Sequence, residues 1–257
     1  MDYGYCFLAV VPVRKEPTSL SEQVTQLIFG DFVEILGTKD SIITSNNWTK
    51  VRILEDGYKG WIDSRCIFKV EKDDVKDNKY LVKDFVAPIA VDSTVIPVPF
   101  GAKILDGEYT LAAHKFHALN GKSLTSPLPF NSGNLNMVMI NYLNCPYQWG
   151  GKSTLGIDCS GFTQIVYSFF GIKLFRDAKD QAKQGKDIAF EDIKEGDLMF
   201  FGEDLEHISH VGIALKDSHV LHCSAYVHAD QYTKEGIFDT FIKGAYSHHF
   251  LKAVRLI

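Results

Sequence analysis

The sequence has no long hydrophobic run, no basic cluster and no paired cysteine motif. No stretch reaches the roughly eighteen apolar residues that a membrane-spanning helix needs. Asp and Glu outnumber Lys and Arg by 32 to 27, and the resulting net charge of −5 argues against a nucleic-acid partner. The five cysteines are scattered and odd in number, which fits a reducing compartment better than a disulfide framework.

The N-terminal residues also lack the basic start, apolar stretch and small-residue cleavage site of a signal peptide. We therefore expect a cytoplasmic chain without a membrane span. A mature chain that had lost a signal peptide would instead be periplasmic or secreted. Hydrophobic residues make up 46% of the 257 residues and charged residues 23%, so the chain can build more than one globular core.

A glycine-rich segment, Tyr147–Phe162, places one cysteine where an apolar helix begins. Apolar residues then recur at spacings of three and four, at Phe162, Ile165, Val166, Phe169 and Phe170. This pattern predicts a helix that begins at Cys159 and stops near Gly171. Because unpaired N–H groups at a helix start favour a thiolate, we expect Cys159 to have a lowered thiol pKa and to act as a nucleophile.

Two short runs of strand character follow, Ile208–Leu215 and His219–Ser224, and a polar turn separates them. The pattern predicts an antiparallel hairpin. If even-numbered residues pair with even-numbered ones, His210 and His222 project from the same face. One imidazole could then take a proton from the thiol while the other orients it.

Other interpretations of these residues are possible. A cysteine at a helix start is more often a small core residue, although Asp158, Ser160 and the nearby glycines argue against plain core filling. Thiolate and imidazole are also the groups that zinc prefers, which makes a zinc set conceivable from Cys159, His207, His210, His222 and Cys223. Because no Cys-x-x-Cys pair is present, we expect neither a metal nor a cofactor. We assign no role to the remaining histidines, His114, His117, His219, His228, His248 and His249.

Five segments in the second half together resemble the NlpC/P60 peptidases, which cleave bacterial cell-wall peptides. They are Tyr147–Gly151, Gly156–Phe162, Glu195–Phe201, His210–Ile213 and Leu221–Ser224. The resemblance implies an α+β, papain-like catalytic domain. It also implies that Cys159 is the nucleophile, His210 the base and His222 the orienting residue.

The first half is rich in short β-type runs, separated by polar and glycine turns. They are Cys6–Val13, Thr25–Phe29, Phe32–Leu36, Trp48–Leu54 and Gly60–Ile62. Their spacing predicts a small barrel, and the segment resembles a bacterial SH3 domain.

A charged stretch, Val70–Asn78, is typical of a linker. The weaker SH3-like block beyond it contains Tyr80–Lys83, Phe85–Val91, Thr94–Pro99, Ala102–Leu105 and Glu108–Leu111. A helix candidate, Asn136–Leu143, then opens the last domain. We therefore expect two small SH3-like barrels, at 1–70 and 71–127, ahead of an NlpC/P60 catalytic domain at 128–257.

This arrangement resembles one subgroup of the family, the γ-D-glutamyl-L-diamino acid endopeptidases of the dipeptidyl-peptidase VI type. The resemblance implies a role in murein recycling. The implied partner is a murein tripeptide or related cell-wall peptide with a free L-alanine amino end, cut between γ-D-glutamate and a diamino acid. Diaminopimelate and lysine both remain open as that diamino acid. We expect a monomer.

The same subgroup implies substrate contacts from Asp158, Ser160, Tyr58 and Glu22, with Asp31 as the substitute for Glu22. Asp158 is the first candidate to bind the free amine, because a buried ammonium needs a carboxylate partner. Ser160 could instead cap the helix, and Tyr58 could simply pack in the barrel. Tyr147 is expected to assist the backbone N–H groups that stabilise an oxyanion.

Two further functions stay open at this point. The chain could be a catalytically inactive module that binds murein peptides. It could also be a papain-like acyltransferase, in which an amine or alcohol accepts the thioester in place of water.

Overall fold

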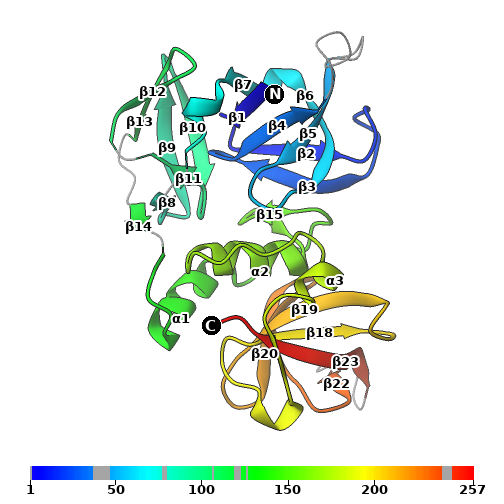
Figure 1. The fold of residues 1–257 in the computed structure, drawn as a ribbon. Coiled ribbons are helices and arrows are strands. Elements are labelled where there is room, and N and C mark those ends of the chain that lie inside the picture. The colour runs from blue at the N-terminus through cyan, green and yellow to red at the C-terminus, as the bar shows by residue number, and fades with distance from the viewer. Residues whose placement is uncertain are drawn as a thin grey trace. The chain divides into compact units, whose positions relative to one another are not determined.

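The computed structural model describes residues 2–36, 47–76, 80–105, 107–118, 123–125, 127–238 and 245–257 (Figure 1). Its internal contacts divide the chain into two compact units. The first unit comprises residues 1–128 together with 149–154, and the second comprises 129–148 and 155–257. Among the described residues, α-helices occur only in the second unit.

The first unit begins with a seven-stranded antiparallel sheet in the order β3-β2-β6-β5-β4-β1-β7. Its strands are β1 Asp2–Cys6, β2 Val10–Arg14, β3 Gln23–Ile28, β4 Phe32–Leu36, β5 Trp48–Ile53, β6 Lys59–Asp63 and β7 Ile67–Val70. Cys6 of β1 and aliphatic residues from β2 to β7 form its own buried core. Four of the five predicted runs form single strands, as expected.

The predicted run Cys6–Val13 is wrong as a single strand, because the chain leaves the sheet between β1 and β2. Phe7 stacks on Phe68 there, with ring centroids 3.9 Å apart. The residues between β1 and β2 are apolar and packed, so the hydrophobic run in the sequence continues past the end of β1 and does not indicate where the strand stops.

The rest of the first unit forms two smaller sheets, β10-β9-β13-β12 and β11-β8-β14. The strands are β8 Tyr80–Val82, β9 Val86–Val91, β10 Thr94–Pro99, β11 Lys103–Ile104, β12 Tyr109–Leu111, β13 His114–Ala118 and β14 Ser123–Thr125. The last two were not predicted, since neither contains an apolar run. Strand β15, Lys152–Ser153, also belongs to this unit.

The linker predicted from Val70 to Asn78 begins at the end of β7 and contains a 3-10 turn, Lys72–Asp74. Asn78 lies outside the described residues. That the second block is an SH3-like barrel, and that the domains are 1–70, 71–127 and 128–257, remain predictions.

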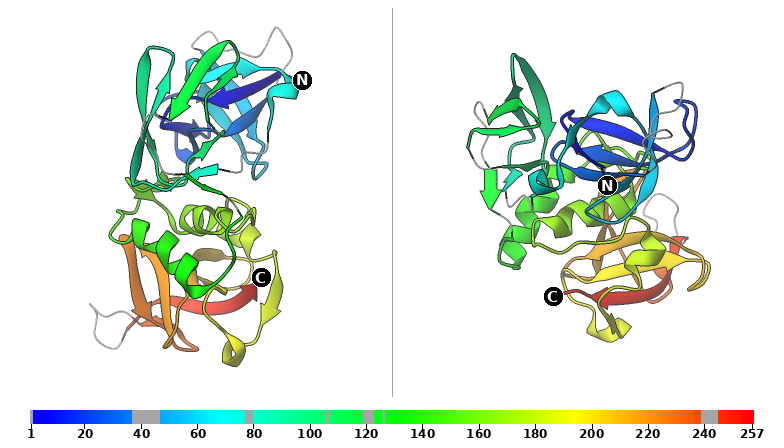
Figure 2. Two further views of the ribbon diagram at one scale, coloured as in Figure 1. Left: turned by 90° about the vertical axis from the view of Figure 1, so that its left-hand side faces the viewer. Right: turned by 45° about the horizontal axis from the view of Figure 1, so that its top comes forward.

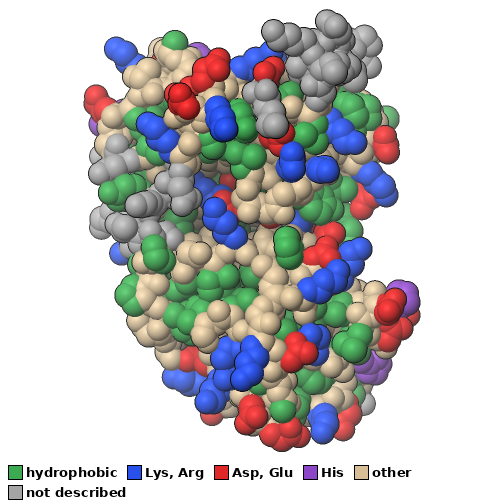
Figure 3. Space-filling view, in the orientation of Figure 1, with side chains coloured by type: hydrophobic (Ala, Val, Ile, Leu, Met, Phe, Trp, Pro, Cys, Tyr) green, Lys and Arg blue, Asp and Glu red, His purple; other side chains and the backbone are tan. Residues whose placement is uncertain are grey.

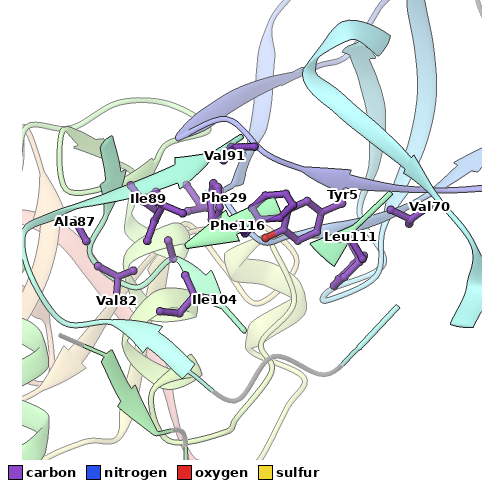
Figure 4. Close-up of a cluster of buried hydrophobic side chains, with 14 residues drawn as sticks. Tyr5, Phe29, Val70, Val82, Ala87, Ile89, Val91, Ile104, Leu111 and Phe116 are labelled. Atoms are coloured by element: carbon purple, nitrogen blue, oxygen red, sulfur yellow. The ribbon is translucent and has the colours of Figure 1, made fainter. Parts of the chain in front are cut away.

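Aromatic rings join the two β-rich parts of the first unit in one core (Figure 4). The ring of Tyr5 lies 5.9 Å from that of Phe29 and 5.5 Å from that of Phe116, edge to face. The hydroxyls of Tyr5 and Tyr109 are 3.0 Å apart. Burial of these large side chains between strands distant in sequence stabilises the pair of sheets as one unit.

The second unit is an α+β structure with the sheet order β17-β23-β18-β19-β20-β21, and β22 pairs with β23 (Figures 1 and 2). Its strands are β16 Gly156–Ile157, β17 Lys186–Ile188, β18 Leu198–Gly202, β19 Ile208–Ala214, β20 His219–Ser224, β21 Tyr226–Gln231, β22 Gly236–Phe238 and β23 Tyr246–Arg255. Its helices are α1 Ser132–Met139, α2 Cys159–Ser168 and α3 Ala178–Gln181. Helix α2 packs against β19 and β20, the strands of the predicted hairpin.

The predicted start of α2 is confirmed, and the helix stops where a glycine permits it. Gly171 has φ of 74°, a left-handed conformation that favours glycine. The N–H groups of Gly171 and Ile172 donate to the carbonyls of Ser168 and Tyr167, each at 3.1 Å. This pattern of two bonds closes the last turn of the helix.

The predicted start of α1 at Asn136 is wrong, because the helix begins one turn earlier at Ser132. The side chain of Asn131 caps it by accepting a hydrogen bond from the N–H of Asn134 at 2.9 Å. The first residues of α1 are mostly polar, so the apolar spacing that predicts a helix begins only after the helix has started.

Acidic and basic side chains are interspersed on the face drawn in Figure 3. Within the described residues, none of the helices has the length and apolar character needed to cross a membrane.

Candidate active site

Cys159 is the first residue of α2, as predicted, and the preceding residue, Asp158, caps the helix. The Asp158 carboxylate accepts a hydrogen bond from the N–H of Gly161 at 2.7 Å, which caps the helix. The Cys159 side chain is buried and receives backbone hydrogen bonds from Val211 and Ser160. These N–H groups point at the sulfur, where negative charge would develop in a reaction.

The prediction of a lowered thiol pKa is wrong for this conformation. Burial raises the pKa of Cys159 to about 12, and the nearby Asp158 carboxylate adds to the rise. The backbone N–H of Val211, the Arg176 cation and the backbone N–H of Ser160 act in the opposite direction but do not cancel the burial. The resting side chain is therefore a protonated thiol, because the desolvation that a buried anion suffers exceeds what the helix start supplies.

The predicted hairpin is confirmed, and it brings the two histidines together. In the ladder of β19 and β20, Gly212 pairs with His222 and Ala214 with Val220, so even-numbered residues share a face. The Nε2 atom of His210 lies 2.9 Å from the Nδ1 atom of His222, and both side chains are buried. His222 therefore holds one nitrogen of His210 and leaves Nδ1 for proton transfer.

The thiol of Cys159 lies against Val211, the strand residue next to His210. Val211, which donates its N–H to the thiol, directly follows His210 and precedes the first pair of the ladder at Gly212. A direct hydrogen bond between the thiol and His210 is not among those of the described residues. General-base contacts often tighten only when a substrate is bound, so this arrangement is compatible with proton transfer.

Three residues that the sequence interpretation missed extend the cluster: His228, His248 and Asp230. The ring of His248 stacks on that of His210 with centroids 4.1 Å apart. Burial, followed by the effect of His248, His222 and His228, holds the pKa of His210 well below its usual value. His228 pairs with His222 in the ladder of β20 and β21. Knowing that register would have indicated His228, but the register is not encoded in the local sequence.

Asp230 accepts from two of these histidines. Its Oδ2 atom lies 3.3 Å from Nε2 of His222 and 3.0 Å from Nε2 of His228. Among the described residues, these three are the group whose donor atoms lie close enough together, within 4.8 Å, to hold a metal ion. The carboxylate already satisfies both ring nitrogens, so the contacts need no ion. The zinc set considered from the sequence is a different one, and its His207 is exposed and paired with Asp204.

Asp158 and Ser160 belong to a buried network centred on Arg176. The guanidinium donates to the two carboxylate oxygens of Asp158 at 3.0 and 2.5 Å and to the hydroxyl of Ser160 at 2.8 Å. Both charged side chains are almost fully buried. Arg176 therefore already balances the charge that was expected to bind a substrate amine, and the substrate role of Asp158 and Ser160 stays a prediction.

Tyr147 is half-exposed and is held by its backbone. Its N–H donates to the carbonyl of Ala225 at 2.8 Å, and it forms a bridge with Ile157, two residues before the nucleophile. Burial raises the pKa of its phenol, and the thiol of Cys159 and the carboxylate of Asp158 add to the rise. The phenol thus remains protonated and able to donate, which suits the predicted oxyanion role without testing it.

The three remaining candidates lie in the first unit. Glu22 accepts from the indole Nε1 of Trp149 at 2.9 Å and from Lys15 at 3.3 Å. Asp31 is buried and paired with Lys103 at 3.0 Å, while Tyr58 packs partly against the core of the seven-stranded sheet. Each therefore has a structural use, and their part in substrate recognition stays a prediction.

Comparison with protein families identifies both kinds of domain that the sequence resembles. Residues 144–246 match the NlpC/P60 family, and residues 13–66 match the bacterial dipeptidyl-peptidase SH3 domain. The chain thus carries an NlpC/P60 domain together with an SH3 domain of this type, and the resemblance is confirmed. Cys159, His210 and His222 all lie within the NlpC/P60 segment.

Known relatives match about a third of this chain. A γ-D-glutamyl-L-lysine dipeptidyl-peptidase of Bacillus subtilis is 45% identical over 83 residues, which are 32% of this chain and 28% of the relative. A dipeptidyl-peptidase 6 of Lysinibacillus sphaericus is 37% identical over 92 residues, 35% of this chain and 32% of the relative. The chain thus matches about a third or less of the length of these relatives.

Solved structures share the fold over more of the chain. An NlpC/P60 family protein from Bacillus cereus aligns with a TM-score of 0.77 and 20% identity, covering 99% of each chain. An NlpC/P60 endopeptidase from Photobacterium damselae aligns with a TM-score of 0.73 and 18% identity, covering 95% of this chain and 68% of that one. At these identities the likeness concerns the fold.

Proposed function

We propose that this chain, with its NlpC/P60 domain and its dipeptidyl-peptidase SH3 domain, is a cysteine peptidase that hydrolyses peptides derived from peptidoglycan. One observation carries the proposal. Cys159 begins α2, and its thiol lies against the residue that follows His210, whose other nitrogen is held by His222 at 2.9 Å. Nucleophile, base and orienting group are the parts that covalent acyl transfer needs.

The chemistry starts from a neutral pair. The thiol of Cys159 is protonated and His210 is neutral, since burial raises the pKa of the first and lowers that of the second. As the sulfur attacks the scissile carbonyl, its proton moves to Nδ1 of His210. The imidazolium then protonates the leaving amine, which leaves a thioester on Cys159. Water, deprotonated by His210, hydrolyses that thioester and restores the thiol.

The oxyanion of each step needs hydrogen-bond donors. The backbone N–H groups at the start of α2 are the candidates, with the phenol of Tyr147 as a further donor. One such donor typically contributes about 3 kcal/mol to transition-state stabilisation, and a general base roughly a hundredfold in rate. Loss of the nucleophile should cost more than either.

The proposed substrate is a short murein peptide with a free L-alanine amino end, in cell-wall recycling. The bond cut joins γ-D-glutamate to a diamino acid, and the name of the Bacillus subtilis relative makes lysine the first to test. A monomer in the cytoplasm suits such a small substrate. Asp158 is retained as a candidate for the amine, although its pairing with Arg176 gives the carboxylate a structural use as well.

The test is mass spectrometry of the purified protein with L-Ala-γ-D-Glu-L-Lys, the same peptide ending in diaminopimelate, and both with acetylated amino ends. Release of L-Ala-D-Glu from the free peptides alone supports the peptidase and the requirement for an amino end. Cleavage of acetylated peptides as well would keep the peptidase and refute that requirement.

The matched control is Cys159→Ala, which should fold normally and show no turnover. Normal cleavage by this variant would refute the assignment of the nucleophile. Binding of the peptides without cleavage by the wild-type protein would favour the inactive binding module. An adduct formed with an added amine, in place of hydrolysis, would favour the acyltransferase.

A further inference from the structure

The hydrogen-bond chain of the candidate site continues past the orienting histidine. Nε2 of His222 lies 3.3 Å from Oδ2 of Asp230, on the neighbouring strand β21. In the ladder, His222 pairs with His228 and Val220 with Asp230, so both β21 side chains share the face of His222. The Asp230 side chain is 10% exposed and that of His222 is 1% exposed, so water has little access to the contact.

The direction of each hydrogen bond follows from the last acceptor. A carboxylate only accepts, so the proton in the contact between His222 and Asp230 belongs to Nε2 of His222. In the neutral ring Nδ1 of His222 is then an acceptor, and Nε2 of His210 must donate to it at 2.9 Å. Nδ1 of His210 is left unprotonated. This is the nitrogen that a general base for Cys159 requires.

Both His210 and His222 are held in the neutral form, with one protonated ring nitrogen each. Burial is the first cause that lowers the pKa of His222 and of His210, and the charge on neighbouring histidines adds to it. Burial opposes ionisation of Asp230, but the hydrogen bond from His222 and the nearby His228 outweigh it and hold the pKa of Asp230 below its usual range. The acceptor at the end of the chain is therefore an anion.

His228 is the second histidine that lies against this carboxylate. Its Nδ1 atom lies 2.8 Å from the carbonyl oxygen of Tyr226, and its Nε2 atom lies 3.0 Å from Asp230. Asp230 therefore lies against two histidines of the cluster, and the hydrogen-bonded pair of His210 and His222 ends at an ionised carboxylate.

We propose that Asp230 is a positioning residue. It fixes the tautomers of His222 and His210 so that Nδ1 of His210 carries no proton and can accept one from Cys159. This inference rests on the proposed function only where it names the reaction that His210 catalyses; the tautomers themselves do not depend on the substrate. Without the carboxylate, His222 can carry its proton on Nδ1 instead. It then donates to His210, whose own proton must move to Nδ1, and the base is lost.

The first test reads the tautomers directly in the wild-type protein. Ring ¹⁵N chemical shifts of protein labelled at histidine, in the presence of EDTA, distinguish Nε2–H from Nδ1–H. The signals are assigned by replacing His210 and His222 one at a time. We expect Nε2–H for both rings at neutral pH. Nδ1–H on His210 in the wild-type protein would overturn the proposal, whatever the enzyme cleaves.

The second test uses Asp230→Asn, whose amide can donate to Nε2 of His222, and Asp230→Glu, which keeps the carboxylate. We expect Asp230→Asn to lower kcat on the murein peptide roughly 10- to 100-fold with KM unchanged, and to move part of the His210 signal to Nδ1–H. Asp230→Glu should recover part of kcat. A kcat of Asp230→Asn within twofold of the wild type would overturn the proposal.

A matched control and a substrate-free readout complete the design. Asp204 makes the same kind of contact with the exposed His207, at 2.9 Å, so Asp204→Asn should leave both kcat and the tautomers unchanged. The rate at which iodoacetamide alkylates Cys159 needs no peptide and should fall with Asp230→Asn. If the wild-type protein cleaved no peptide, the proposed function would fail, while alkylation and ring shifts would still decide the role of Asp230.

Discussion

Replacing Arg176 by methionine removes the cation of a buried ion pair while keeping most of the side-chain volume. The guanidinium holds both carboxylate oxygens of Asp158, and the exposed fractions of the two side chains are 2% and 7%. Removing one partner of such a pair typically costs about 3–5 kcal/mol, because the other charge stays buried without its counter-ion. We expect Arg176→Met to lower the stability of the start of α2 by that amount.

The assay has to follow the second unit alone. Trp48, Trp61 and Trp149 all belong to the first unit, so tryptophan fluorescence does not report on α2. Hydrogen exchange measured by mass spectrometry on peptides that cover α2 does so. A loss of about 3 kcal/mol corresponds to exchange that is faster by roughly a hundredfold.

The double variant separates the charge from the packing. Asp158→Asn alone removes the carboxylate charge that faces Arg176, and Arg176→Met alone removes the cation that faces Asp158. Together the two changes should cost less than the sum of the single ones, by on the order of 2 kcal/mol. Lys183→Met is the control, since its pair with Asp180 is exposed and should contribute under about 1 kcal/mol. A loss below about 1 kcal/mol for Arg176→Met would refute the reasoning.

Four further predictions concern the candidate site and the end of α2. The pKa of His210 is lowered, so its neutral form persists below pH 6.5, and the acid limb of kcat/KM should lie below that value. The unfolded chain takes up this proton near pH 6.5 and the folded one does not, so the second unit should lose stability as pH falls below 6.5. Far-UV circular dichroism melts at several pH values measure this, and a stability that does not change with pH would contradict it. A Cβ added at Gly212 would lie 2.6 Å from Cγ2 of Val220 and 3.0 Å from Cβ of His222, so Gly212→Ala should push β20 and the His222 side chain away and lower kcat. Unchanged kinetics would count against the placement of His222. Gly171→Ala should destabilise the second unit by about 1 kcal/mol, measured by the same melts, since alanine is strained at φ of 74°; an unchanged midpoint would show that the strain is relieved.

Much of the candidate site could be predicted from local sequence. Helix α2 begins at Cys159 because its apolar period and its capping Asp158 are encoded within a dozen residues. The hairpin that carries His210 and His222 is likewise local, since a short polar turn determines which residues pair. The family resemblance added roles to these residues, and those roles remain proposals.

Residues contributed by more distant strands could not be predicted. His248 lies on β23, and its ring stacks on that of His210 although 38 positions separate them in the chain. His228 and Asp230 are close to His222 in sequence, but only the register of β21 turns them to the same face. Nothing in their local pattern distinguishes them from surface histidines and acids.

The sequence alone determined the helix that carries Cys159, the hairpin that carries the two histidines and the β-rich nature of the first half, because each depends on periodicity and turns within a short segment. Only the tertiary structure decided the ionisation of the site, where the local rule predicted a lowered thiol pKa and burial produced a raised one. It also decided which charges face one another, as Arg176 does Asp158 and Asp230 does His222. Desolvation and long-range pairing depend on the whole packed chain, so no local pattern encodes them.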